Sequence, residues 1–434
     1  MTATRMRALT LAALAGVWAA SAYSLWASSK VPDLHLPHLD PHRLFSGHTL
    51  ARTGSYERFE RWSFVLSQLA VLSAFVWYAL RGERFTRESA AGRIGTGMLL
   101  GMLGFAIVWL VQVPFRLADL WWARRHGLEK QGYLQFLLSD WIQLGSQFLL
   151  LCLALLIVMG LAGRLGSRWW LLGGPSFAGL VALFLFVSPY LTPGLKRPRD
   201  ARLAAHAHAI AAREGVGDVP LRVEKVSKRT RAINAYAFGL GPSRRVVLWD
   251  TLLDGRYARR EVLFVLGHEY GHQARNHLLK GVAWFALFAL PEAFLIERLT
   301  RRKGGMRNPA AVPLALLVLV VMQLLALPLR NAISRHIEAE ADWMGLQTTR
   351  DPAAATLLFE HFTSDDLSQP DPPTWSYLLL DDHPTTMQRV AMACAWARTT
   401  TRARSVRGLP ADCGSPRSSA TSRANPASRP RAPS

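Results

Sequence analysis

The sequence predicts a mainly α-helical, polytopic membrane protein with about seven transmembrane helices and a small β-sheet outside the bilayer. Half of the 434 residues are hydrophobic, only 19% are charged, and the mean hydropathy is +0.12, which is too apolar for an ordinary soluble protein. Seven long apolar runs follow one another along the chain, and a stretch with β-branched pieces separates the fifth from the sixth. Most of the chain is therefore expected within a lipid bilayer.

The net charge of +21 raises the question of a nucleic-acid partner. The positive residues are dispersed among loops and a C-terminal tail, with no RNA- or DNA-binding motif between them, so we predict no nucleic-acid partner. The cysteines, Cys152, Cys394 and Cys413, lie far apart without disulfide or metal-ligand spacing. The sequence therefore predicts no disulfide framework.

Residues 1–192 are predicted to form a membrane region of five spans. The first, 8–27, is an uncharged run of 20 residues, long enough to cross the hydrocarbon core of a bilayer. A cleaved signal peptide is the alternative, because residues 20–22 are small, but the apolar run continues past them. The other four spans are expected at 62–80, 94–115, 141–163 and 169–192.

Residues 193–280 change to the composition of a soluble segment. The sequence predicts a helix over 201–213 and a longer helix from about 259 to 280. Between them, three apolar and β-branched pieces are separated by turn-forming Gly and Pro, which predicts a small sheet. Its strands are expected at 221–226, 235–238 and 246–249.

Residues 281–330 are predicted to form a transmembrane hairpin, with spans at 281–296 and 309–329 joined by a strongly basic connection. The second span continues without an obvious break into a helix that leaves the membrane and opens the segment 331–397. The remaining residues, 398–434, are rich in Ser, Ala, Pro and Arg and are expected to be disordered.

The most informative stretch reads HEYGH, from His268 to His272. A helix advances 3.6 residues per turn, so the two histidines share one face and can bind one metal ion, with Glu269 beside them. Two imidazoles so placed suit zinc, and a catalytic zinc needs a third protein ligand. Glu338 is the best candidate, because the hairpin returns it to the side of the membrane where the histidines lie. The alternative is a polar helix with solvated histidines, since so short a pattern can arise by chance.

Other polar residues near these candidates receive different interpretations. Asp342 lies one turn beyond Glu338 on the same helical face, where it can accept a hydrogen bond from a ligand imidazole and fix its tautomer. A solvated acidic face is the alternative. Glu340 points away from that face, and His277, five residues after His272, is assigned no metal.

Five segments in the same order resemble the integral-membrane zinc metalloproteases of the type I CAAX prenyl protease family, with the heat-shock membrane zinc proteases as relatives. They read NAYAFG, VVLWDTLL, GHEYGHQARNH, SRHIEAEAD and HPTTMQRV, between about residues 225 and 389. The resemblance implies a gluzincin-type catalytic domain in a zinc metalloendopeptidase. It also implies that His268, His272 and Glu338 bind one zinc ion per chain and that Glu269 is the general base.

The resemblance extends to two further pairs of residues. His383 and Arg389 match a downstream motif whose basic residues are expected near the substrate, where they would stabilise the developing oxyanion. Asn234 and Ala235 match an edge strand that is expected to pair with the substrate backbone. The expected partners are therefore the lipid bilayer and peptide or membrane-protein substrates at its surface.

The resemblance also implies a multi-pass protein, expected in a bacterial inner membrane with its catalytic side in the cytoplasm. Arginines are frequent on both faces, so the positive-inside rule does not decide this orientation, and the sequence leaves the oligomeric state open. Two other hypotheses are a catalytically inactive membrane scaffold or receptor that retains the protease fold, and a transporter. The intact motif argues against the first, because an inactive relative would be free to lose Glu269.

Overall fold

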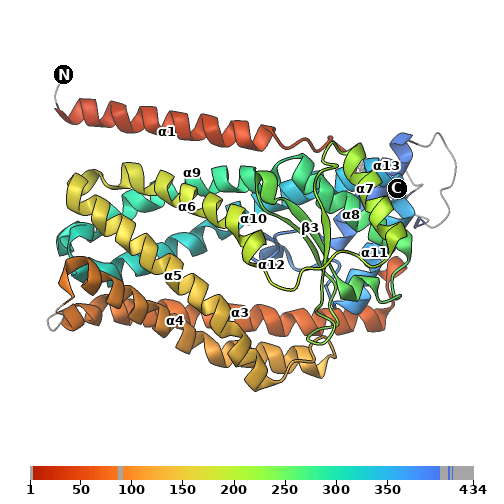
Figure 1. Ribbon diagram of the computed structural model, residues 1–434, viewed down its shortest axis with the longest axis horizontal. Coiled ribbons are helices and arrows are strands. Elements are labelled where there is room, and N and C mark those ends of the chain that lie inside the picture. The colour runs from red at the N-terminus through yellow and green to blue at the C-terminus, as the bar shows by residue number, and fades with distance from the viewer. Residues whose placement is uncertain (1–2, 87–90, 401–408, 411–412, 414–434) are drawn as a thin grey trace, which may run out of the picture.

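Figure 1 shows the computed structural model, an elongated molecule with a bundle of long helices at one end and a mixed helical and β unit at the other. The structure describes residues 3–86, 91–400, 409–410 and 413. The α-helices are α1 (Ala3–Ala27), α2 (Pro41–Leu44), α3 (Gly47–Arg81), α4 (Gly92–Arg125), α5 (Tyr133–Leu165), α6 (Trp170–Leu191), α7 (Ala201–Arg213), α8 (Arg259–Ala274), α9 (His277–Thr300), α10 (Val312–Thr349), α11 (Pro352–Asp365), α12 (Thr374–Leu379) and α13 (Thr386–Thr400). The strands are β1 (Leu221–Glu224), β2 (Ala235–Phe238) and β3 (Arg245–Trp249).

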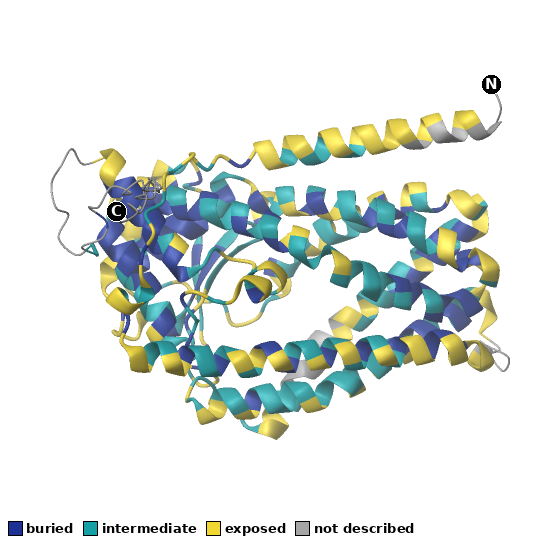
Figure 2. Ribbon diagram, turned by 180° about the vertical axis from the view of Figure 1, so that it is seen from behind, coloured by how far each residue is buried: buried dark blue, intermediate teal, exposed yellow. Residues whose placement is uncertain are grey.

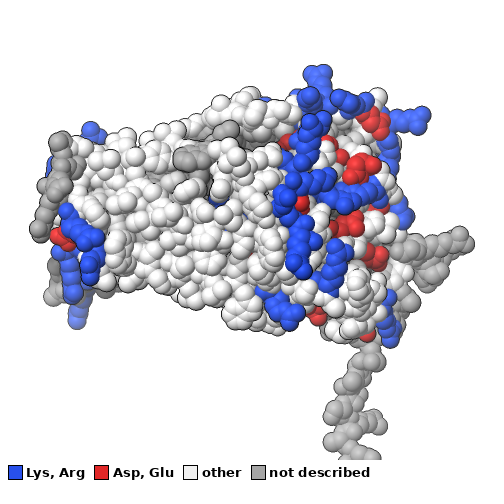
Figure 3. Space-filling model, turned by 90° about the horizontal axis from the view of Figure 1, so that it is seen from below, with Lys and Arg blue, Asp and Glu red and all other residues white. Residues whose placement is uncertain are grey.

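The predicted fold class is confirmed. In the described part of the chain, six helices are long and apolar enough to cross a bilayer, namely α3, α4, α5, α6, α9 and α10. Helix α1 carries a shorter apolar stretch, Ala12–Ala27, which lies within the first predicted span, 8–27. On the face seen in Figure 3, a wide band without charged side chains separates two charged rims, as expected for a protein embedded in lipid.

Helix α1 runs alongside the bundle and stands apart from it over most of its length (Figure 1). Two tryptophans of α1 contact the two hairpin helices, α9 and α10. Trp18 Nε1 donates a hydrogen bond to Leu287 O of α9 at 2.7 Å, and the Trp26 ring stacks on His336 of α10 with ring centroids 4.2 Å apart. The end of α1 therefore lies against the helix that carries Glu338.

Two clusters of buried apolar side chains stabilise the two ends of the molecule. One lies within the bundle and joins α3, α4 and α5 to α9 and α10. The other lies in the mixed unit, where buried residues are dense in Figure 2, and joins α7 and the sheet to α8, α11 and α13. Leu39 and Phe45, from the segment that follows α1, belong to this second cluster.

The predicted sheet is confirmed, with the strand order β1-β3-β2. Strand β3 lies in the centre, parallel to β1 and antiparallel to β2, and its residues 246–248 are buried, as β-branched and apolar residues in a central strand should be. Gln273 of α8 donates hydrogen bonds to Phe238 O and Arg245 O, which fixes α8 against the sheet. Among the described residues β2 pairs with β3 alone, so its outer edge is free.

The single long helix predicted from about 259 to 280 is wrong. Helix α8 ends at Ala274, and α9 starts at His277 after a left-handed residue, Asn276, with φ 53°. Asn tolerates this conformation better than most residues because its short polar side chain can bond locally. By contrast, α10 runs unbroken from Val312 to Thr349, as predicted.

The expectation of no disulfide is also wrong, because Cys394 of α13 is bonded to Cys413. Their Cα atoms are 5.1 Å apart, and their separation of 19 residues along the chain did not predict this approach. Cys152 is free and buried in α5. Most of the predicted disordered tail, 398–434, lies outside the described residues.

Candidate metal centre

Helices α8 and α10 pack closely along the HEYGH motif because glycines face one another there. A Cβ atom added to Gly267 would lie 3.1 Å from Gly345 Cα, and one added to Gly271 would lie 2.9 Å from Met344 Cβ. A Cβ at Gly345 would lie 3.2 Å from the backbone nitrogen of His268. Only residues without a side chain allow such an approach, which brings the acidic face of α10 onto the histidines.

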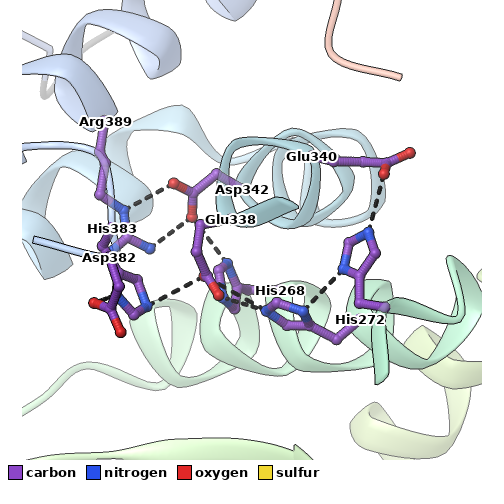
Figure 4. Close-up of polar contacts among 9 residues, drawn as sticks. His268, His272, Glu338, Glu340, Asp342, Asp382, His383 and Arg389 are labelled. Atoms are coloured by element: carbon purple, nitrogen blue, oxygen red, sulfur yellow. Dashed lines mark hydrogen bonds and ion pairs between the residues drawn. The ribbon is translucent and has the colours of Figure 1, made fainter. Parts of the chain in front are cut away.

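The three predicted ligands meet at one point (Figure 4). Glu338 Oε2 lies 3.2 Å from His268 Nε2 and 3.5 Å from His272 Nε2, and the two imidazole nitrogens are 3.1 Å apart. The histidines come from α8 and the carboxylate from α10, so 66 residues of chain separate Glu338 from His272. The hairpin of α9 and α10 closes this distance.

The three residues fit a metal ion. Glu338 Oε2 is buried and accepts no hydrogen bond from the described residues, although imidazole nitrogens surround it. A buried carboxylate oxygen without a partner is costly, and a cation at this point would satisfy it. Two imidazoles and one carboxylate form a ligand set typical of catalytic zinc, which leaves a position open for water or substrate.

Asp342 contacts the first predicted ligand, His268, at the ring nitrogen that does not face Glu338. Its Oδ1 lies 2.9 Å from His268 Nδ1, the hydrogen-bond partner that the helical spacing predicts. Arg389 of α13 donates to both oxygens of Asp342, at 2.8 Å from Nε and 2.7 Å from Nη2. Burial lowers the pKa of His268, but its interactions with the carboxylates of Asp342 and Glu338 outweigh burial and raise that pKa to about 10. The surroundings of His268 therefore favour positive charge.

His383 lies on the side of the cluster that faces solvent. Its Nε2 lies 3.2 Å from Glu338 Oε2, and its Nδ1 lies 2.7 Å from Asp382 Oδ1. The side chain is 49% exposed, so it can reach a molecule bound from solvent. Burial lowers the pKa of His383, but the nearby carboxylates of Asp382 and Glu338 outweigh burial and raise that pKa to about 9. His383 is thus held as a cationic donor.

Glu269 shares a pocket with His268, His383 and Arg389. Burial raises the pKa of the Glu269 carboxyl, and the neighbouring histidines oppose that rise. Asn234 and Ala235 line the same pocket from the free edge of the sheet. Its remaining walls are apolar and consist of Ile233, Leu252, Phe264, Val265, Leu358 and Phe362.

The sequence analysis gave no role in the site to two residues near the second predicted ligand, His272. These residues are His277 and Glu340. His277 Nδ1 lies 2.9 Å from His272 Nδ1, and His277 Nε2 lies 3.0 Å from Glu340 Oε2. On a continuous helix His277 would point away from His272, but the break at Asn276 turns it back. The Asn itself was the available signal, because Asn is common where a helix ends.

Comparison with known proteins places this site in a family context. Residues 197–397 match the model of Peptidase family M48, a range that contains all of the predicted site residues. A protein named uncharacterized metalloprotease YhfN, from Bacillus subtilis, is 29% identical over 270 residues, which cover 59% of this chain and 62% of the relative. A CAAX prenyl protease 1 homolog from Dictyostelium discoideum is 32% identical over 149 residues, which cover 33% of this chain and 34% of the relative. The chain thus spans less than two thirds of the length of these relatives.

The fold is also that of a solved crystal structure. The crystal structure of Ste24p from S. mikatae superposes with a TM-score of 0.65 and 19% sequence identity, over 89% of this chain and 97% of the other. Together, the comparisons confirm the resemblance to the CAAX prenyl proteases that the five motifs predict.

Proposed function

The chain is a CAAX prenyl protease-like protein with a Peptidase family M48 segment, and from this premise we propose that it is a zinc-dependent endopeptidase acting on peptide bonds at or near the membrane surface. One observation carries the proposal. Glu338 Oε2 is buried without a hydrogen bond from the described residues, lies among imidazole nitrogens, and is directly beside a pocket that contains Glu269. His268, His272 and Glu338 would hold the metal.

Bound zinc would supply Lewis acidity for a water molecule and for the scissile carbonyl. Glu269, which follows the first ligand, takes the proton of the attacking water and returns it to the leaving amine. Burial suits this carboxyl to the task, because its raised pKa makes it a stronger base than an exposed glutamate.

His383 is placed to stabilise the oxyanion that forms on the carbonyl. It is half exposed and adjacent to Glu338, its raised pKa favours the cationic form, and Asp382 orients its ring. Arg389 shares the pocket, but its Nε and one terminal nitrogen are bonded to Asp342. We therefore assign Arg389 the task of holding Asp342 and His268, in place of the direct oxyanion contact inferred from the sequence.

Substrate would bind as an added strand. The free edge of β2 offers backbone groups beside Asn234 and Ala235, and a peptide paired there would cross the pocket next to Glu269. The apolar walls of the pocket favour a substrate with an apolar side chain next to the scissile bond. Relatives named CAAX prenyl proteases suggest prenylated peptides as one substrate class, and cleavage of matched peptides with and without the prenyl group would test it.

The decisive experiment compares the full-length wild type with Glu269→Gln for bound zinc and for peptide cleavage. We expect about one zinc per chain in both proteins, and a loss of about 10²- to 10⁴-fold in cleavage rate for the variant. Glu261→Gln is the matched control, because it makes the same change on the same helix, two turns from the motif, and should cleave like the wild type.

Each alternative hypothesis gives a different result. An inactive scaffold or receptor would bind zinc without cleavage in any of the three proteins, and a transporter would have no need of the metal. Cleavage that survives Glu269→Gln would contradict the assigned general base.

A further inference from the structure

We propose that His277 and Glu340 are positioning residues for the second metal ligand, His272, and that the segment following α1 holds Glu340 in place. The inference rests on the proposed zinc site and concerns residues to which that proposal gives no part. Asp342 bonds the first ligand directly, whereas Glu340 acts on the second ligand through one intervening imidazole. In Figure 4 the two carboxylates point to opposite sides of α10.

With His277 neutral, the contacts from Glu340 to His272 assign one donor and one acceptor to each hydrogen bond. Glu340 is a carboxylate and only accepts, so His277 Nε2 carries the hydrogen that it donates over 3.0 Å. Neutral His277 then has an unprotonated Nδ1, which accepts from His272 Nδ1 over 2.9 Å. His272 is left with an unprotonated Nε2, and this is the nitrogen that faces Glu338 Oε2. A metal ligand needs that tautomer.

Glu340 is a buried carboxylate that several side chains contact. Its side chain is 1% exposed, and three side chains bond it: His277, Arg275 through Nε at 2.6 Å and Lys280 through Nζ at 3.2 Å. A carboxylate so deeply buried would be costly without such partners. Two cations offset its negative charge, and its Oε2 lies within hydrogen-bond distance of His277.

The segment after α1 completes this arrangement. The backbone N–H of Lys30 donates to Glu340 Oε1 at 2.9 Å, and Lys280 Nζ donates to Ser28 O at 3.1 Å. The stacked pair of Trp26 and His336 lies beside these bonds, at the junction of α1 with α10. The first membrane span is thereby connected to the metal centre through one carboxylate.

The test measures zinc release from the full-length protein in detergent after addition of excess chelator, with a colorimetric zinc indicator. We expect Glu340→Gln and His277→Phe to release zinc about 10- to 100-fold faster than the wild type, as typical for loss of a group that orients a ligand. Glu261→Gln removes an equally buried carboxylate, also bonded to a histidine, away from the metal, and should release zinc like the wild type. Wild-type release rates in Glu340→Gln and His277→Phe would overturn the proposal.

A second pair of variants leaves Glu340 itself unchanged. Lys30→Pro removes the backbone N–H that bonds Glu340, whereas Lys30→Ala keeps it. We expect release about 3- to 10-fold faster from the proline variant alone, the effect of one hydrogen bond. Equal rates in the two variants would overturn the part assigned to the segment after α1.

His272→Ala separates this inference from the proposed function. If that variant still binds one zinc at His268 and Glu338 as tightly as the wild type, the metal site itself is wrongly assigned. If it loses zinc while Glu340→Gln and His277→Phe hold zinc normally, only the positioning role fails. The visible spectrum of the cobalt-substituted protein gives a second readout, since altered geometry at His272 changes its intensity.

Discussion

Asp342 binds two partners at once, and both belong to the proposed zinc site. One of its oxygens meets His268 Nδ1, and both meet the guanidinium of Arg389, which also lies 4.3 Å over the Phe359 ring. A carboxylate held in this way makes the ligand imidazole a better donor to a metal and keeps its ring from turning. Its contribution should therefore appear in metal affinity.

We expect Asp342→Asn to weaken zinc binding about 10- to 100-fold, because the neutral amide is a poorer acceptor for His268 and leaves Arg389 without its counter-charge. Competition with a chelator of known affinity measures the change. Glu360→Gln on α11 removes a carboxylate outside the cluster and serves as the control. Equal affinities in all three proteins would exclude this role.

His383 should act on catalysis and leave the metal in place. We expect His383→Ala to keep its zinc but to lower kcat about 10²- to 10³-fold, the usual loss when one oxyanion donor is removed. Steady-state cleavage and zinc content together test this. His361→Ala removes another histidine that bonds a carboxylate, Glu261, and should leave kcat unchanged. Loss of zinc in His383→Ala would show that it is a ligand instead.

Helical periodicity, together with the hairpin that returns Glu338 to the histidines, was enough to predict the proposed ligands. His268, His272 and the pair of Glu338 and Asp342 each follow helical spacing, which the helices α8 and α10 preserve. His277 could not be placed by the same rule, because a break in the helix decides where it points. A rule that assumes a continuous helix fails at the residue where the helix ends.

The packing of α8 on α10 sets the position of Glu338 relative to the histidines. Gly267, Gly271 and Gly345 lie in this contact, and their Cβ atoms would meet backbone or a near side-chain atom. An added methyl group there must push the two helices apart, since protein interiors have little free space. Metal binding and stability should therefore change together.

We expect Gly345→Ala to destabilise the protein by about 1–3 kcal/mol and to lower its zinc content, because the new Cβ would lie 3.2 Å from His268 N. Thermal unfolding in detergent and zinc analysis measure the two effects. Gly281→Ala in α9 is the control, because a Cβ atom there has nothing within 4 Å. Wild-type stability and zinc content in Gly345→Ala would contradict the close-packing account.

At the scale of elements, hydropathy and strand patterns were reliable, and boundaries were less so. The helix expected over 201–213 is α7 without any shift, and the strand at 235–238 is β2. The sixth span was expected at 281–296 but α9 extends from His277 to Thr300, because polar residues continue the helix beyond the apolar run. Amino-acid composition therefore predicts which residues lie in the lipid, but it does not predict the residue at which a helix ends.

The proposed metal centre lies in the mixed unit, at one end of the helical bundle. The uncharged band of Figure 3 has a basic rim at either end, so charge alone leaves the orientation open, as it did in the sequence. The position of α1 and the pairing of Cys394 with Cys413 likewise depend on long-range packing and were beyond sequence patterns. The long membrane-spanning helices followed from length and hydropathy.

We propose that the mixed unit faces the cytoplasm, as inferred from the family resemblance. In sealed, right-side-out vesicles, a membrane-impermeant maleimide should label Arg302→Cys, at the opposite end of the bundle, and should label Lys228→Cys only after permeabilisation. The wild type controls for its own cysteines, of which Cys152 is buried. Labelling of Lys228→Cys alone in intact vesicles would reverse the orientation.

The central claim is that His268, His272 and Glu338 bind one zinc ion. X-ray absorption at the zinc edge of the purified protein tests it most directly. We expect one zinc per chain with nitrogen or oxygen ligands at about 2.0–2.2 Å and scattering from two imidazoles. Sulfur ligands at about 2.3 Å, or a spectrum unchanged in Glu338→Gln, would contradict the account.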